Sequence, residues 1–230
     1  MGIEDEVCFI ISADHGESFG EHGIYMEHAN ASESVHHIPL IVRAPGVTKP
    51  GTVVDGLLYN VDVIATITDM VGLPVPEGWD GRSFLPALKG EDWPGRDHLV
   101  MDHALYACQR AVRDRKWYFL RTYHEGLYRY DPVALYDMEN DPYQTKNVAE
   151  QHPEIVREMD HRLMNWLHEH SGKPGGKPDP LQKVIETGPF KYVTVSQWVK
   201  RLRDEGFHAD AEALERKYSG ESLASVYGSV

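Results

Sequence analysis

Acidic and imidazole side chains are concentrated in the segment that follows the first apolar run of the chain. Residues 7–11 read VCFII, and residues 13–28 read ADHGESFGEHGIYMEH. The second segment carries side chains that bind metals and transfer protons in proteins, namely Asp14, His15, Glu17, Glu21, His22 and His28. Such groups are costly to bury unless they are paired or bound to a metal. The segment is therefore either a solvated loop or a site.

Asp14 and His15 come where the strand expected over residues 7–11 ends. In open α/β sheets, ligands bind at the carboxyl ends of the strands. A carboxylate oxygen and an imidazole nitrogen can together hold a divalent cation. Two ligands are nevertheless fewer than calcium or zinc requires. From residue types alone, a metal site and a solvated Asp-His turn are both possible interpretations of this pair.

Composition excludes several classes of protein. The chain has 230 residues, and its 36 acidic and 23 basic side chains give a net charge of −13. This charge disfavours binding to nucleic acid or to anionic membranes. No apolar run is long enough for a membrane span. We expect a soluble protein whose compartment, cytoplasmic or periplasmic or secreted, stays open. The two cysteines, Cys8 and Cys108, cannot form a disulfide framework, and we expect both to be reduced and packed.

The spacing of apolar residues predicts an α/β layer followed by an antiparallel sheet. The continuous apolar runs at 7–11 and 38–46 are typical of strands covered on both faces in a parallel sheet, and a helix is expected over 60–72. Short β-rich segments then predict an antiparallel meander, at 98–103, 109–114, 116–123 and 134–139.

The remainder of the chain is predicted to be helical. Pro153 opens an amphipathic helix, and residues 171–180, SGKPGGKPDP, have the composition of a linker. A capping box of Thr194 and Gln197 predicts a helix to Asp204, and a second helix follows over 209–218. We expect this tail to pack on its own body or on a neighbouring subunit. The predicted units are residues 1–92, 93–172 and 173–230.

Four segments together resemble the sulfatase family of the alkaline-phosphatase-like superfamily. They are ADHGESFGEHG (13–23), HIPLIVRAPG (37–46), GWDGRSFLPALKG (78–90) and ALYDMENDPYQTKNVA (134–149). The resemblance covers residues 3 to about 168. It implies an α/β fold: the end of an alkaline-phosphatase-like sheet, then a small α+β domain with an antiparallel sheet, then a helical tail. The first unit would be the carboxyl-terminal part of the catalytic domain.

The resemblance also implies roles for individual residues. Asp14 and His15 match the family's late pair of metal ligands, for which Ca²⁺ is the expected ion and Mn²⁺ or Zn²⁺ are alternatives. His28 matches the cationic residue at the sulfate group, where an imidazole can also give a proton to the leaving alcohol. His22 would orient this loop around the ligands. His37 replaces the usual Arg or small residue, and its role is left open.

Two parts of the family's site are absent from this sequence. The family nucleophile is a formylglycine made from the Cys or Ser of C/S-x-P-x-R, and neither cysteine nor any serine here has that context. The early Asp-Asp metal pair is also absent. We therefore expect the carboxyl-terminal portion of a sulfatase, inactive alone, whose partners are a sulfate-ester substrate and the missing amino-terminal half.

Other functions remain open. A phosphonate monoester or phosphodiester hydrolase of the same superfamily is the second hypothesis, because an Asp-His pair is common there and imidazole favours Mn²⁺ or Zn²⁺. A phosphoethanolamine transferase ranks third, since that family lacks the LYDMENDP segment. The non-enzyme hypothesis is an interaction module whose exposed sheet edge meets the missing half or a second copy, giving a homo-oligomer.

Overall fold

A four-stranded antiparallel sheet forms the centre of the molecule. The computed structural model describes residues 2–3, 5–171, 178–189 and 194–219. The sheet contains, in order, β5 (Leu99–His103), β6 (Cys108–Arg113), β7 (Trp117–His124) and β8 (Val133–Asp137). Every neighbouring pair is antiparallel, as expected for strands joined by short turns. The predicted meander is confirmed.

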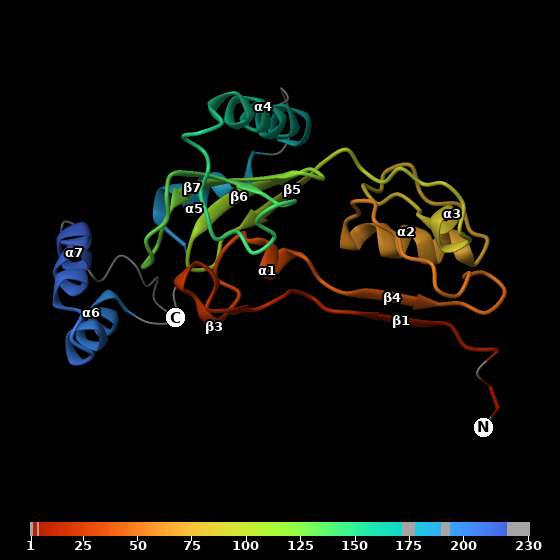
Figure 1. The fold of residues 1–230 in the computed structure, drawn as a ribbon, viewed down its shortest axis with the longest axis horizontal. Helices are drawn as coiled ribbons and strands as arrows, with labels where there is room; N and C mark the ends of the chain where they lie inside the picture. The colour runs from red at the N-terminus through yellow and green to blue at the C-terminus, as the bar shows by residue number, and fades with distance from the viewer. Residues whose placement is uncertain (1, 4, 172–177, 190–193, 220–230) are drawn as a thin grey trace.

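Different elements cover the two faces of this sheet (Figure 1). The helix α4 (Pro153–His170) lies across one face, and the short helix α1 (Glu33–His36) lies under the other. The core on the α4 side contains Val100, Val112, Phe119, Leu135, Met159 and Leu163. The opposite core contains Ala31, Ala111, Tyr118, Leu120, Ala134, Tyr136 and Met138. Alternation along β7 and β8 places successive side chains in the two cores.

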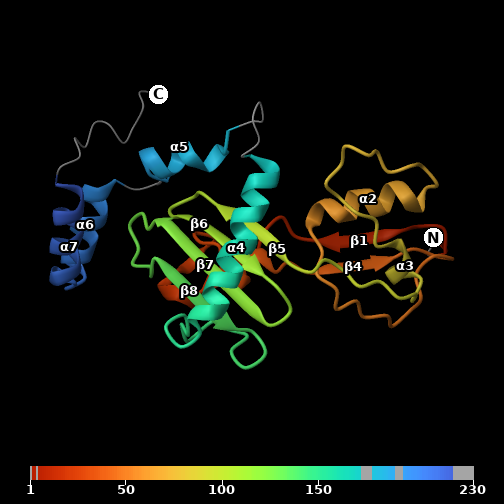
Figure 2. The same cartoon turned by 90° about the horizontal axis from the view of Figure 1, so that it is seen from above.

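A second, smaller layer is built from the amino-terminal part of the chain. It contains β1 (Phe9–Ser12) and β4 (Leu40–Arg43), the helix α2 (Asn60–Met70) and the short helix α3 (Leu85–Leu88). Leu40 and Val42 pack against Phe84 and Leu88 on one face of the strand pair. Figure 2 shows this layer beside the central sheet, at the opposite end from the last two helices. The helix expected over 60–72 is therefore present.

The prediction that residues 7–11 and 38–46 form buried parallel strands is wrong. Strands β1 and β4 pair antiparallel, with Phe9 opposite Arg43 and Ile11 opposite Ile41. A parallel pair needs a crossover that packs on its own sheet. Here the connecting residues fold instead onto the β5–β8 sheet and return beside β1 (Figure 1). The outer face stays open: Phe9, Ile11 and Ile41 are 49%, 57% and 60% exposed.

The connection between β1 and β4 carries a small hairpin. It consists of β2 (Ser18–Phe19), the 3₁₀ turn η1 (Glu21–Gly23) and β3 (Tyr25–Glu27), and α1 follows. Buried Ile24 and Ala29 pack against Tyr106, which follows β5. The hairpin of the acidic and imidazole-rich segment thus packs against the loop between β5 and β6.

Three helices complete the described part of the chain. They are α5 (Pro180–Thr187), α6 (Val195–Asp204) and α7 (His208–Tyr218). The capping box of Thr194 and Gln197 is present at the start of α6. Both α6 and α7 pack on Leu127, in the turn after β7, so this tail contacts its own body. Residues 172–177 of the predicted linker lie outside the described residues, and the three unit boundaries stay predictions.

The two cysteines differ in their surroundings. Both are free thiols, with Cys108 buried and Cys8 exposed. The expected packing therefore holds for Cys108 and is wrong for Cys8, because Cys8 precedes the open strand pair. Over the ranges that the structure describes, no helix has the length and apolar character needed to cross a membrane.

Candidate metal and ester site

A close backbone contact fixes the segment that carries His15 and Glu17. The N–H of Gly16 donates to the carbonyl of Val35 at 2.7 Å. A Cβ at position 16 would lie 2.0 Å from the carbonyl oxygen of Ser34, so only glycine fits there. This contact holds the loop flat against α1. His15, which precedes the glycine, lines the cleft, and Glu17 follows the glycine.

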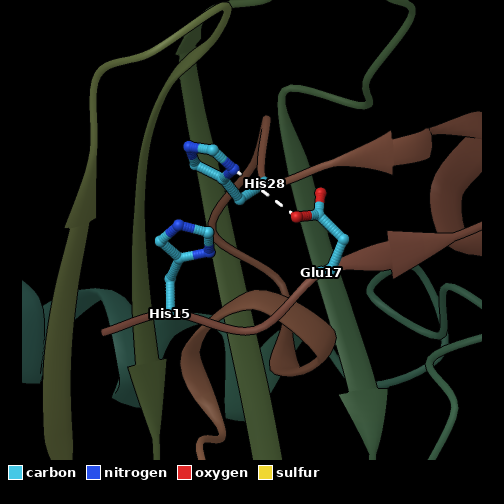
Figure 3. Close-up of side chains that lie close together, drawn as sticks. All are labelled: His15, Glu17 and His28. Carbon is cyan, nitrogen blue, oxygen red and sulfur yellow. Dashed lines mark ion pairs between the residues drawn. The ribbon is translucent and has the colours of Figure 1, made fainter. Parts of the chain in front are cut away.

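His15, Glu17 and His28 converge on one point (Figure 3). The His15 and His28 rings stack with centroids 3.9 Å apart and planes at 26°. Glu17 Oε2 lies 3.8 Å from His28 Nδ1. One ligand atom from each of the three residues lies within 4.8 Å of the others. These distances match a group of side chains that can enclose a single cation.

Two atoms of this cluster are buried and lack a hydrogen-bond partner. They are Glu17 Oε1 and His28 Nδ1, and neither has such a partner among the residues that the structure describes. His15 Nδ1 lies 2.7 Å from the carbonyl of Gly16, so Nδ1 carries the proton and Nε2 keeps its lone pair. A buried carboxylate oxygen and a free imidazole lone pair are ordinary metal ligands. The cluster therefore fits a divalent cation chemically.

Asp14 stands beside the cluster rather than in it. Its side chain is 89% exposed, and its Oδ2 lies 3.8 Å from His15 Nε2. The backbone N–H of His15 donates to Asp14 Oδ1 at 3.0 Å. This hydrogen bond holds the pKa of Asp14 below its usual value. Asp14 is thus an ionised carboxylate facing the open side of the cleft, next to the predicted ligand His15.

His22 lies at the tip of the hairpin and does not join the cluster. Its Nε2 is 3.4 Å from Gln144 Oε1, and its ring meets Tyr136 edge-on at 5.7 Å. Burial lowers the pKa of His22. The side chain thus joins the hairpin tip to the loop after β8. Its predicted role in orienting the ligand loop stays a prediction.

His37 makes a local ion pair at the end of α1. Its Nδ1 lies 3.1 Å from Glu33 Oε1, and Arg113 approaches the same carboxylate at 3.4 Å. The hydrogen bond to Glu33 raises the pKa of His37. The His37 side chain is largely exposed, and it lines the cleft that also contains His15 and His28.

Comparison with known proteins identifies the family. Residues 20–169 match the family model described as N-sulphoglucosamine sulphohydrolase, C-terminal. The chain belongs to the sulfatase family. This match confirms the resemblance expected from the sequence and places the chain in the carboxyl-terminal portion of such proteins.

Curated relatives of this sulfatase chain are much longer. Arylsulfatase K of Homo sapiens is 31% identical over 176 residues, which cover 73% of this chain and 32% of that protein. Choline-sulfatase of Rhizobium meliloti is 30% identical over 152 residues, which cover 64% of this chain and 28% of that protein. The chain thus spans about a third of the length of these relatives.

Solved structures share the fold. A putative sulfatase from Bacteroides thetaiotaomicron superposes with a TM-score of 0.65 at 24% identity, over 74% of this chain and 38% of that one. A phosphonate monoester hydrolase from Silicibacter pomeroyi superposes with a TM-score of 0.61 at 26% identity, over 73% and 36%. The predicted fold class is confirmed, and both kinds of hydrolase share it.

Sequence reasoning assigned no metal-binding or catalytic role to Glu17, His36 or His103. Glu17 completes the cluster. The sequence feature that could have indicated this role is its position two residues after His15. His36 and His103 meet edge-on at 6.2 Å and line the same cleft, whose volume is about 1210 Å³. Burial lowers the pKa of each to about 4, so both imidazoles are neutral at neutral pH. His103 lies far along the sequence, and only the fold brings it here.

Proposed function

We propose that this chain supplies one wall of the active site of a metal-dependent sulfuric ester hydrolase. The observation that carries the proposal is the convergence of His15, Glu17 and His28, two of which line the cleft, in a member of the sulfatase family. The relatives act on sulfate esters by name, and the chain covers only part of each. Sulfate-ester hydrolysis is therefore our proposal for the complete protein.

The metal would be held by His15 and Glu17, with Asp14, whose Oδ2 lies 3.8 Å from His15 Nε2, as a further carboxylate. Bound at such a site, a divalent cation supplies Lewis-acid stabilisation of negative charge that develops on an ester oxygen. Calcium is the ion expected from the family, and it requires six to eight oxygen ligands. The imidazoles of this cluster favour manganese or zinc instead. Titrating the chain with calcium, manganese and zinc in turn shows which of these ions binds most tightly.

His28 would face the ester group and protonate the leaving alcohol. General acid catalysis requires an imidazole within hydrogen-bond reach of the leaving oxygen. Stacking on His15 and the approach of Glu17 limit the orientations open to the His28 ring. Because an ordered donor loses little freedom when substrate binds, these two contacts would favour proton transfer.

The rest of the site would come from the amino-terminal portion of the catalytic domain. The sequence contains no C/S-x-P-x-R segment that could become the nucleophile. Phe9, Ile11 and Ile41 form an exposed apolar face on β1 and β4, which further strands or helices of that domain would cover. We therefore propose that the isolated chain has no sulfatase turnover.

Reconstitution tests this function. The chain is mixed with the amino-terminal portion of a sulfatase that carries a formylglycine, and aryl sulfate hydrolysis is measured. We expect activity from the mixture only, and its loss when Asp14→Ala and His15→Ala are combined. Asp92→Ala, at an exposed position outside the cleft, is the control. Turnover by the isolated chain, or activity that survives the double substitution, contradicts the proposal.

Phosphonate monoester or phosphodiester hydrolysis is the second candidate. It is favoured by the structural similarity to the Silicibacter pomeroyi enzyme and by the Asp14-His15 pair. The same reconstituted preparation, assayed with an aryl sulfate and an aryl phosphonate monoester, ranks the two functions by kcat/KM. If neither ester is cleaved, a non-catalytic interaction module becomes the better description.

A further inference from the structure

A second hollow lies at the tip of the β2–β3 hairpin, which we call the hairpin-tip pocket. Its lining includes Glu21, His22, Asp131, Tyr136, Tyr143 and Gln144, and its volume is about 630 Å³. His15, Glu17 and His28 are not among its lining residues, so it is separate from the candidate metal site. The volume lies within the range of small-molecule sites.

Gln144 lines this pocket and has a buried polar side chain. The side chain is only 5% exposed. Its Oε1 accepts from the backbone N–H of Glu33 at 2.9 Å, which fixes which end of the amide is oxygen. The opposite end, Nε2, is buried and has no hydrogen-bond partner within the described ranges. A buried donor left unpaired costs free energy, so this N–H group favours a ligand with an acceptor oxygen.

Two strained residues meet at the same place. His22 and Gln144 both have a φ of 55°, and neither is glycine. Their side chains approach each other at 3.4 Å, although 122 positions separate them in sequence. Left-handed backbone at non-glycine residues persists only where surrounding contacts impose it, and such positions cluster at binding sites.

The pocket is negatively charged. Glu21 and Asp131 contribute carboxylates, and no Lys or Arg is among the lining residues. The N–H of Phe19 donates to Glu21 Oε2 at 2.6 Å, and Asn147 Nδ2 donates to Asp131 Oδ2 at 2.7 Å. Each of these bonds uses one oxygen of its carboxylate and limits the orientations of that side chain. A cation is attracted by this arrangement, and a sulfated or phosphorylated ligand is repelled.

Aromatic rings make an organic cation a better ligand than a metal ion. Tyr143 is 76% exposed at the mouth, and Tyr136 packs against His22. Ring faces attract ammonium groups and also cover the apolar parts of an organic ligand. Across the described residues, the group with metal-ligand spacing is His15, Glu17 and His28, so Glu21 and Asp131 do not form part of a metal cluster.

We propose that the hairpin-tip pocket binds a small hydroxylated organic cation. Its ammonium group is bound by Glu21 and Asp131, a hydroxyl oxygen accepts from Gln144 Nε2, and its carbon skeleton lies against Tyr143. All these groups belong to this chain. The site therefore requires neither the amino-terminal portion nor ester hydrolysis, and it stands or fails independently of the proposed function.

Ligand titration of the full 230-residue chain, followed by NMR of the backbone amides, tests this site. Glucosamine and ethanolamine are the cationic probes, and glucose and glucose 6-sulfate are the neutral and anionic controls. We expect saturable shifts at residues 20–22 and 143–145, with glucose at least tenfold weaker. Equal binding of glucose and glucosamine, or no saturable shift with either cation, overturns the proposal.

Charge-removing substitutions separate the site from general surface attraction. Glu21→Gln and Asp131→Asn keep the shape of each side chain, and each is expected to weaken glucosamine binding about five- to tenfold. Glu77→Gln removes one exposed charge elsewhere and is the matched control. Tyr143→Ala is expected to weaken binding about two- to fivefold through the lost ring face. If Asp131→Asn and Glu21→Gln both bind like Glu77→Gln, the assignment is wrong.

Discussion

Glu17 and His28 face each other across 3.8 Å, and each has a buried atom without a hydrogen-bond partner in the part of the chain that is described. Ligands bound here would replace the hydrogen bonds that burial removes, with a cation at Glu17 and an ester oxygen at His28. The residue types of the segment predicted this chemistry. Glu17 received no role, since the sequence alone does not tell which carboxylates turn towards a neighbouring imidazole.

Metal binding by the isolated chain follows from this geometry. We expect Zn²⁺ or Mn²⁺ to raise the Tm, because a ligand that binds only the folded state stabilises it by about 2.7 kcal/mol at one hundred times its Kd. Glu17→Gln is expected to weaken binding about tenfold or more. Glu27→Gln, on the same hairpin, is the control. Equal Tm shifts for the two variants would exclude Glu17 as a ligand.

The half-buried histidine His36 predicts a pH dependence of stability. Burial lowers its pKa from 6.5 to about 4, although Glu33 acts in the opposite direction. Between these values the unfolded chain binds more protons than the folded chain, so stability present at pH 7 is lost as the pH falls. We expect this group to contribute a loss of about 1–2 kcal/mol between pH 7 and pH 5.

Urea unfolding at pH 7 and pH 5 measures this contribution. His36→Phe removes the titrating group, so its free energy of unfolding should fall less with pH than that of the unchanged chain. His161→Phe replaces an exposed histidine on α4 and should keep the original pH dependence. If the free energy of unfolding of His36→Phe falls with pH as steeply as that of the unchanged chain, His36 has the same pKa in the folded and the unfolded chain.

Helices and strands form where sequence periodicity predicts them, provided that turn and capping residues predict the same boundaries. Alternation and short turns predicted the meander, and Pro153 with its apolar stripe predicted α4. The direction of β4 relative to β1 was not predictable in this way. It depends on where the connecting residues pack, and Tyr118 Oη donating to the carbonyl of Ala31 at 2.6 Å holds that connection on the other sheet. Long-range contacts of this kind leave no periodic pattern.

The attachment of α5 to the sheet depends on one buried arginine. Arg110 is 2% exposed and binds Asp102 at 2.7 Å and Asp179 at 2.6 Å. Asp179 also accepts the N–H of Leu181 as the N-cap of α5. Asp179→Asn weakens the ion pair and keeps the cap, and we expect a loss of about 2 kcal/mol because the remaining buried charge is less well compensated.

Hydrogen exchange locates this effect. In Asp179→Asn, amides of residues 181–186 should exchange faster, while those of α4 keep their protection. Glu186→Gln, which alters an exposed side chain of the same helix, is the control. Faster exchange throughout the chain would show that the pair stabilises the whole fold rather than the attachment of α5.

At the scale of the whole molecule, family resemblance predicted more than the physical patterns did. The four segments gave the family and the fold, and residues 20–169 match its carboxyl-terminal model. They could not give the exposure of the amino-terminal layer, because the apolar run at residues 7–11 has the pattern of a strand covered on both faces. Exposed Val61, Ile64 and Val71 on and after α2 enlarge the open apolar surface of this layer.

The open face of β1 and β4 gives the final prediction. Ile11 and Ile41 are paired across the strands and are 57% and 60% exposed. Ile11→Glu should therefore change the Tm of the isolated chain little, since exposed substitutions usually alter stability by about 0.5 kcal/mol or less. It should abolish activity in the reconstituted mixture, because a carboxylate would be buried without a partner when the amino-terminal portion covers this face.

Met164→Glu, at an exposed position on α4, is the comparison variant, and sedimentation velocity is measured alongside. If two copies of the chain pair through β1, Ile11→Glu also removes the dimer. If Ile11→Glu reconstitutes activity as efficiently as Met164→Glu, the open face is not where the rest of the catalytic domain binds. The outcome matters because the cleft with His15 and His28 begins at the end of this same strand pair.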